Sequence, residues 1–144
     1  MDNRYDILQL LHQVAEGAVP PEEALSQLKR EPFEDLGYAK VDLHRGVRQG
    51  AAEVLYGAGK TPEQIAGIAQ AMGERGCENI LITRLNPEAA SFVAKAVPLD
   101  YHPVPRLAVA FPGERKALGR IVVATGGTSD MAVAEEAALT AETL

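Results

Sequence analysis

The sequence predicts an α/β protein, and two features carry this prediction. From about residue 38 onward, short apolar or alternating segments typical of strands take turns with segments of helical periodicity. Hydrophobic residues make up 47% of the 144 residues and charged residues 24%, which is the balance of a folded globular protein. The length allows one ordinary core, or one small domain together with part of another.

Composition also excludes several classes of function. Asp and Glu number 20 against 14 Lys and Arg, and the resulting net charge of −6 has the wrong sign for binding nucleic acid. No apolar run reaches the ~18–20 residues of a membrane span, and the first residues lack the basic character of a signal peptide. Cys77 is the single cysteine, which excludes an internal disulfide framework and a cysteine-based zinc cage. We therefore expect a cytoplasmic protein that binds neither nucleic acid nor membranes.

Residues 1–32 are predicted to form a helical hairpin. Asn3 can cap the first helix, apolar residues follow it at helical spacing, and Gly17 can end it. Pro21 suits the first turn of a second helix, which has one apolar stripe and ends before Pro32.

Residues 33–114 are predicted to form a small α/β domain. Its expected elements are a strand at 38–43, a helix from about 45 to 56, a helix at 61–75, a strand at 79–83 and a helix at 86–97. The helix at 61–75 has the strongest local signal, because Thr61, Pro62 and Gln64 provide a cap, an N1 proline and a capping-box partner. We expect the two strands to share one sheet on which the helices at 61–75 and 86–97 pack.

Prolines limit the strands expected between residues 99 and 111. Pro103 and Pro105 lie inside this stretch, so any strand in it is predicted to be short or at a sheet edge. Residues 107–111 are apolar and are the better candidate for the core.

Residues 115–144 are predicted to open a second α/β domain after a linker at 112–120, which is rich in Pro, Gly and charges. The apolar run at 121–124 is typical of a parallel strand covered on both faces, and a helix is expected at 131–144. One strand and one helix cannot bury their own apolar faces, and no stop signal follows the helix. We therefore expect these residues to be the incomplete start of a larger domain, and to be disordered or covered by a neighbouring chain.

The turn between that strand and that helix is the strongest candidate for a binding site. Glycines let a backbone approach a ligand closely, and a helix N-terminus presents free N–H groups and a positive dipole to an anion such as phosphate. Hydroxyl and carboxylate groups follow the glycines and can bind phosphate or ribose. The candidate residues are Gly126, Gly127, Thr128, Ser129 and Asp130. The alternative is a tight turn in which Ser129 or Asp130 merely caps the helix.

A second set of candidates is basic. Arg45 and Arg48 lie three residues apart, Lys60 follows in a glycine-flanked turn, and Arg84 comes directly after the predicted strand at 79–83. The last position is where parallel strands present ligands, so these side chains are candidates for contacting an anionic substrate. Ion pairing with acidic neighbours is the alternative interpretation.

The remaining reactive side chains point to no chemistry of their own. His12, His44 and His102 show no metal-ligand spacing. Cys77 follows Gly76 at a predicted helix C-terminus, which raises the pKa of a thiol and favours a structural role.

Three segments together resemble a known family. They are the run from 38 to 66, which begins YAKVDLHRGVRQGAAEVLYGAGK, the LITR at 81–84 and the IVVATGGTSD at 121–130. In combination they resemble the LarB family of nickel-pincer cofactor biosynthesis proteins, whose second domain is similar to carboxyaminoimidazole ribonucleotide mutase, PurE. The resemblance extends from about residue 33. It implies a small N-terminal domain followed by the start of a PurE-like, Rossmann-like domain with three αβα layers.

The resemblance also implies an activity. Family members carboxylate the pyridinium ring of nicotinic acid adenine dinucleotide with CO2 or bicarbonate and release AMP, and a cysteine attacks the ring. That cysteine follows the TGGTSD segment in the family, so Cys77 inherits no role and we expect no catalytic residue in this chain, which would be inactive by itself. Residues 126–130 match the family's first phosphate-and-ribose loop. Mg²⁺ would accompany the substrate, with no tightly bound cofactor, and the full-length protein would be a homo-octamer.

Two alternatives stay open. The protein could instead be a PurE-like mutase or carboxylase of purine biosynthesis. It could also be an independent α/β module that binds a nucleotide or a protein without chemistry.

Overall fold

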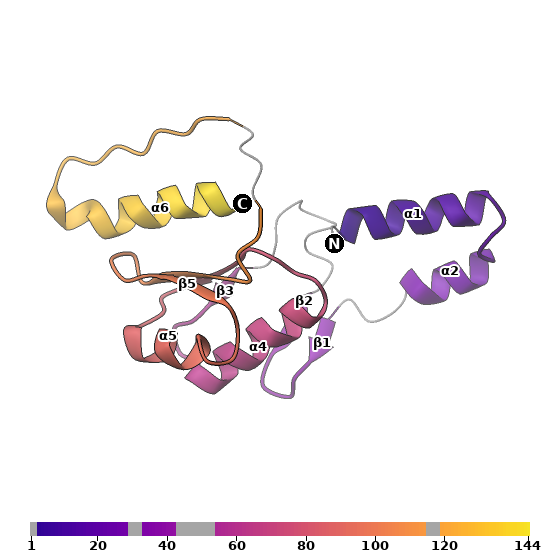
Figure 1. Cartoon of the computed structure of the whole chain (residues 1–144), viewed down its shortest axis with the longest axis horizontal. Helices are drawn as coiled ribbons and strands as arrows, with labels where there is room; N and C mark the ends of the chain where they lie inside the picture. The colour runs from indigo at the N-terminus through magenta and orange to yellow at the C-terminus, as the bar shows by residue number, and fades with distance from the viewer. Residues whose placement is uncertain (1–2, 29–32, 43–53, 115–118) are drawn as a thin grey trace. The chain divides into compact units, whose positions relative to one another are not determined.

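The computed structural model of the chain describes residues 3–28, 33–42, 54–114 and 119–144 (Figure 1). The chain divides into two compact units, Met1–Ala51 and Ala52–Leu144, and each is described by itself.

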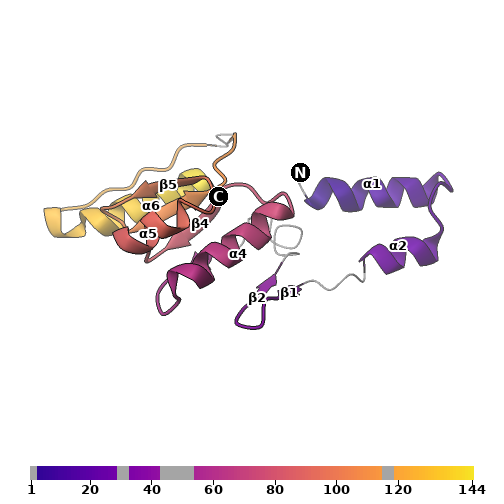
Figure 2. The ribbon, with the colours of Figure 1, turned by 60° about the horizontal axis from the view of Figure 1, so that its bottom comes forward.

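The first unit begins with the predicted helical hairpin. Helix α1 (Asn3–Ala15) and helix α2 (Pro21–Leu28) lie side by side, as both views of the ribbon show (Figures 1 and 2). Gly17 adopts a φ of 74° in the connection, a left-handed conformation that glycine accepts without a steric penalty. The hairpin prediction is confirmed.

A short antiparallel pair follows in the same unit. Strand β1 (Phe33–Asp35) pairs with strand β2 (Lys40–Asp42), and the turn is closed by the N–H of Leu36, which donates to the carbonyl of Ala39 at 2.9 Å. The strand predicted at 38–43 therefore exists over 40–42, whereas its partner β1 was not predicted. A three-residue strand carries too little periodicity to be recognised.

One expectation about this region is wrong, and a second lies mostly outside the described residues. The strand at 40–42 does not share a sheet with the strand at 79–83, because β2 pairs with β1 in a sheet of their own. The helix expected from about 45 to 56 mostly lies outside the described residues, and its last two residues form strand β3 (Leu55–Tyr56). β3 reads as helical in sequence, and its strand conformation depends on pairing with a distant segment.

The second unit contains a four-stranded mixed sheet. Its order is β3, β4 (Ile80–Thr83), β6 (Leu107–Ala110) and β5 (Leu99–His102), with β3 parallel to β4 and the other pairs antiparallel. The strand at 79–83 is confirmed. So is the expectation for 99–111, because β5 is the edge strand and β6 is central and buried. The α/β fold class is confirmed.

Both faces of this sheet are covered. Ile80 and Ile82 point to one face and Leu81 to the other, since side chains alternate along a strand, and all three are at most 1% exposed. Helix α4 (Pro62–Glu74) and helix α5 (Pro87–Val93) lie on one side of the sheet in Figure 1, and helix α6 (Met131–Thr143) lies on the other. The core of the unit is therefore built on β4 and β6.

Helix α4 forms as its sequence predicts. The hydroxyl of Thr61 accepts from the N–H of Gln64 at 3.3 Å, and the side chain of Gln64 accepts from the N–H of Thr61 at 3.0 Å. Gly76, with a φ of 79°, ends the helix. Within α4, Gly73 leaves space for the ring of Phe111, which occupies the place where a Cβ would lie.

Left-handed residues stand at both ends of the two central strands. Asn79 and Arg84 flank β4, and Arg106 and Phe111 flank β6, with φ between 50° and 56°. Hydrogen bonds from the N–H of Asn79 to the carbonyl of Phe111 and from the N–H of Leu85 to the carbonyl of Arg106 close the ladder. The chain turns out of the sheet at these four positions.

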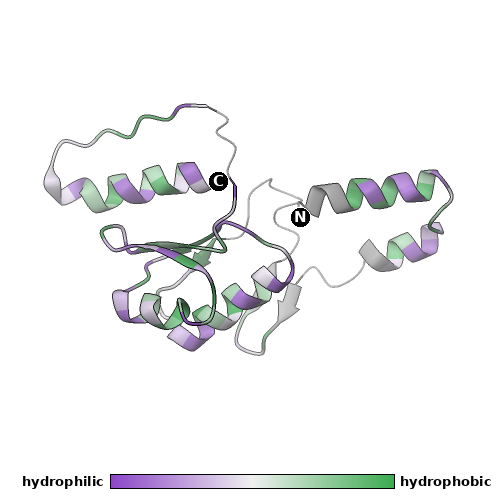
Figure 3. Ribbon diagram, in the orientation of Figure 1, coloured by the Kyte–Doolittle hydropathy of each residue, from purple (hydrophilic) through white to green (hydrophobic). Residues whose placement is uncertain are grey.

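The strand expected at 121–124 is wrong. Residues 121–125 belong to no strand, and Ile121 and Val122 are 74% and 89% exposed, although this segment is as apolar as the strands (Figure 3). The helix that follows is confirmed as α6, preceded by a single 3-10 turn at Thr128–Asp130. Leu139 of α6 packs against Leu81, Leu107 and Val109, so the helix has a packing partner within its own chain.

Candidate functional site

The parallel pair of strands brings two distant basic side chains to one edge of the sheet. Leu55 is in register with Ile82 and Tyr56 with Thr83, so the turn that ends at Lys60 and the residue Arg84 both follow the carboxyl ends of their strands. Ligands of parallel strands bind at this edge. The sequence predicted this position for Arg84, whereas Lys60 joins it because of a strand that the sequence did not predict.

Gly57 holds the two segments close together. Its N–H donates to the carbonyl of Thr83 at 2.8 Å, and a Cβ added to Gly57 would stand 2.8 Å from that same oxygen. A larger residue would therefore push β3 away from the end of β4.

Lys60 is anchored on its own turn. Its Nζ donates to the carbonyl of Tyr56 at 2.8 Å, and this contact holds the ammonium group near the end of β3. The adjacent N-terminus of α4 is capped by the capping box of Thr61 and Gln64. The carboxylate of Glu63 accepts hydrogen bonds from the backbone N–H of Glu63 and from the side chain of Thr61, and these bonds hold its pKa below the usual value. An anion at this edge would therefore bind the cationic side chains of Lys60 and Arg84, and not the backbone N–H groups of α4.

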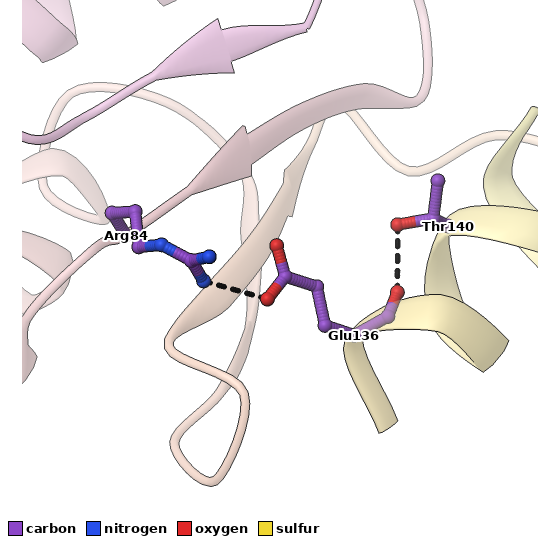
Figure 4. A network of polar contacts seen from close by, with 3 residues as sticks. All are labelled: Arg84, Glu136 and Thr140. Atoms are coloured by element: carbon purple, nitrogen blue, oxygen red, sulfur yellow. Dashed lines mark hydrogen bonds and ion pairs between the residues drawn. The ribbon is translucent and has the colours of Figure 1, made fainter. Parts of the chain in front are cut away.

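Arg84 already holds a carboxylate. Its Nη1 donates to Oε2 of Glu136 on α6 at 2.6 Å, while the hydroxyl of Thr140 donates to the backbone carbonyl of Glu136 (Figure 4). The hydrogen bond and the charge of Glu136 raise the pKa of Arg84, and the nearby phenol of Tyr56 adds a smaller effect in the same direction. The guanidinium is charged throughout the physiological range.

The contact with Glu136 could not have been found in the sequence. The two residues are 52 positions apart and lie in segments with no common motif. Arg84 therefore lies at the sheet edge predicted for it and also forms the kind of ion pair that the alternative interpretation expected. Arg45 and Arg48, the other basic candidates, lie outside the described residues.

The predicted phosphate turn is an exposed bend followed by the 3-10 turn. All five candidates from Gly126 to Asp130 are exposed, and nothing lies within 4 Å of a Cβ placed on Gly126. Neither the 3-10 turn nor α6 has a side-chain cap, and the hydroxyl of Thr125 donates to Oδ2 of Asp130 at 3.4 Å. Asp130 stands at the N-cap position of α6, but no side-chain hydrogen bond caps the helix.

The histidines and the cysteine form no reactive cluster in the part of the chain that the structure describes. No group of three His, Cys, Asp or Glu side chains suited to a metal ion occurs there. His102 lies 3.3 Å from Asp100 on the edge strand β5. Cys77 is half-buried just after α4, with its N–H bonded to the carbonyl of Met72.

Comparison with known proteins identifies the family. The family described as the LarB/PurE-like N-terminal domain matches residues 33–111, which is more than half of the chain. The chain therefore belongs to the LarB/PurE-like family, as its motifs indicated. No curated protein matches the chain. No helix among the described residues is long and apolar enough to span a membrane.

Proposed function

We propose that this chain supplies the N-terminal domain and the first phosphate-binding turn of an enzyme that carboxylates the pyridinium ring of nicotinic acid adenine dinucleotide. Carboxylation would form a carbon–carbon bond and release a ring proton, and hydrolysis of the phosphoanhydride would release AMP. The family match over residues 33–111 is the observation that carries this proposal.

The turn at 126–130 supports the proposal by its chemistry. It brings the hydroxyls of Thr128 and Ser129 to the start of a 13-residue helix, where no side chain makes a capping hydrogen bond. A phosphate is the anion that such a turn binds best. Its exposure leaves room for a ligand as large as a dinucleotide.

The ring-attacking thiol of the proposed reaction has no candidate among these 144 residues. Cys77 lies at the far end of α4 from the carboxyl edge of β3 and β4, and nucleophilic catalysis needs the nucleophile in contact with the substrate. We therefore expect binding, and no turnover, from these residues alone.

The test measures AMP release by chromatography. The product of the complete gene is expected to release AMP and a carboxylated mononucleotide from the dinucleotide with bicarbonate and Mg²⁺, and the 144-residue polypeptide is expected to release neither. Activity of the complete product on carboxyaminoimidazole ribonucleotide instead would assign it to purine biosynthesis. Turnover by the 144-residue polypeptide would place the chemistry within these residues and overturn our placement of the active site.

A matched pair of variants tests the turn itself. Ser129→Ala should weaken dinucleotide binding by roughly tenfold, the effect of one hydrogen bond to a charged group. Thr143→Ala removes a hydroxyl from the other end of α6, where it bonds to the carbonyl of Leu139, and should leave binding unchanged. Equal affinity of the two variants, measured by calorimetry, would reduce the turn to a structural bend.

A further inference from the structure

The ion pair between Arg84 and Glu136 joins groups that are both accessible to water. The side chain of Arg84 is 52% exposed and that of Glu136 is 24% exposed. Ion pairs with this exposure contribute little to stability, because water solvates both groups well when they separate. Another anion can therefore replace the carboxylate of Glu136 at the guanidinium of Arg84 at little cost in stability.

The backbone of Arg84 favours a role for its side chain. With a φ of 56° the residue is in the left-handed region, where glycine or asparagine would be more stable than arginine. This conformation turns the chain out of the sheet directly after β4, and the guanidinium is left at the carboxyl edge beside Tyr56. Arginine is the side chain best suited to bind a carboxylate there.

We propose that Arg84, together with Lys60 on the same edge of the sheet, forms a binding site for a carboxylate-bearing ligand, and that Glu136 occupies Arg84 until such a ligand replaces it. The carboxylate of Glu136 shows which chemistry the site accepts. The choice of a nicotinate-bearing ligand rests on the proposed function, whereas the site itself does not.

Helix α6 connects this site to the phosphate turn. Glu136 lies six residues after Asp130, which corresponds to roughly 9 Å along a helix axis. A ligand that carries both a phosphate and a carboxylate could therefore bind the turn and release α6 from Arg84 in one event. Only the differential affinity of the ligand for the released state can drive this exchange.

The experiment measures binding of two mononucleotides by isothermal titration calorimetry. Nicotinic acid mononucleotide and nicotinamide mononucleotide share a phosphate and differ in that only the first has a ring carboxylate. The wild-type chain should bind the acid more tightly, and Arg84→Gln should lose that preference, with a loss on the order of tenfold for the acid. Lys95→Gln changes the net charge equally at an exposed position after α5, away from the carboxyl ends of β3 and β4, and is the matched control.

The second arm tests the exchange. Glu136→Gln removes the competing charge and should tighten binding of the acid by roughly twofold to threefold, whereas Glu135→Gln, its neighbour on α6, should leave the affinity unchanged. Far-UV circular dichroism confirms that each variant is folded.

Three results would overturn the proposal. Equal binding of both mononucleotides by the wild-type chain, with equal losses in Arg84→Gln, would show that Arg84 binds phosphate and not a carboxylate. Identical affinities of Glu136→Gln and Glu135→Gln would show that Glu136 does not compete. No binding of either mononucleotide at millimolar concentration would exclude the site. Because none of these measurements depends on AMP release, failure of the proposed function would be seen separately.

Discussion

Two apolar segments of similar composition have opposite fates in the second unit. Strands β4 and β6, with the sequences ILIT and LAVA, contain residues that are 0–1% exposed, whereas the IVVA segment at 121–124 lies in water without a strand partner among the described residues. The difference is that β4 has neighbours on both sides and helices over both faces. Apolar character makes a segment suitable for a strand, but hydrogen-bonded neighbours and burial make it one.

The largest effect should come from shortening the same side chain in both segments. Ile82→Ala removes atoms from a fully buried position in β4 and should lower the free energy of unfolding by about 2–5 kcal/mol. Ile121→Ala at a 74% exposed position should change it by less than about 0.5 kcal/mol. Urea unfolding followed by circular dichroism measures both, since the chain has no tryptophan. An equal loss in the two variants would mean that residues 121–124 are buried in solution.

A second pair of variants adds a methyl group instead of removing atoms. Gly57→Ala places a Cβ against the carbonyl of Thr83 and should cost about 1–3 kcal/mol of stability, because backbone atoms there cannot move without separating β3 from β4. Gly126→Ala meets nothing within 4 Å and should have no such cost. An unchanged melting temperature of Gly57→Ala would show that β3 can move away from the end of β4 without loss of stability.

The edge strand β5 is intermediate in burial between β4 and residues 121–124. Replacing its Tyr101 should have a smaller effect on the free energy of unfolding, and this effect should depend on pH. The phenol donates to the carbonyl of Leu85 at 3.1 Å, so Tyr101→Phe should cost about 1 kcal/mol near neutral pH. Burial raises the pKa of Tyr101 above the ordinary value of 10.0. Its contribution is therefore present below pH 10 and is lost as the pH rises through the folded-state pKa.

Thermal melts between pH 7 and pH 11 test this sign. The advantage of the wild type over Tyr101→Phe should shrink above pH 10, while Tyr56→Phe, an exposed tyrosine of β3, should match the wild type near neutral pH. A wild-type advantage that grows at alkaline pH would contradict the assignment of a half-buried, hydrogen-bonded phenol.

The smallest effect concerns the polar contact between α6 and the sheet. A double-mutant cycle of Arg84→Gln and Glu136→Gln should give a coupling energy of only about 0.5 kcal/mol in 0.15 M salt, because exposed ion pairs are well solvated when they separate. A strong coupling, resistant to salt, would show a permanent joint and would argue against exchange of Glu136 for a ligand.

Local signals in the sequence account for much of the fold. The capping box at Thr61 specifies the start of α4 and Gly76 its end, and the apolar run at 80–83 was recognisable as a strand. The helices α1, α2 and α5 follow from their periodicity and termini in the same way, and α6 from its composition alone. These features depend on residues within a few positions of one another, which is why a sequence reveals them.

The candidate site was predictable only in part. Arg84 was placed correctly at the end of a strand, and the turn at 126–130 was recognised from its glycines, although its role stays a prediction. The neighbourhood of Lys60 and Arg84 depends on the pairing of β3 with β4, across a helix of 13 residues. Glu136 is the partner of Arg84 because Leu139 of the same helix packs on the sheet face that carries Leu81 and Val109.

By itself, the sequence determined the fold class, most of the helices, the central strand β4 and the LarB/PurE-like family membership. Only the tertiary structure decided that residues 55–56 form a strand, that β2 pairs with β1, that residues 121–124 form no strand and that Arg84 meets Glu136. The physical reason is the range of the interactions. Helix termini and periodicity are local, whereas strand pairing and ion pairs across 52 residues exist only after distant segments have packed together.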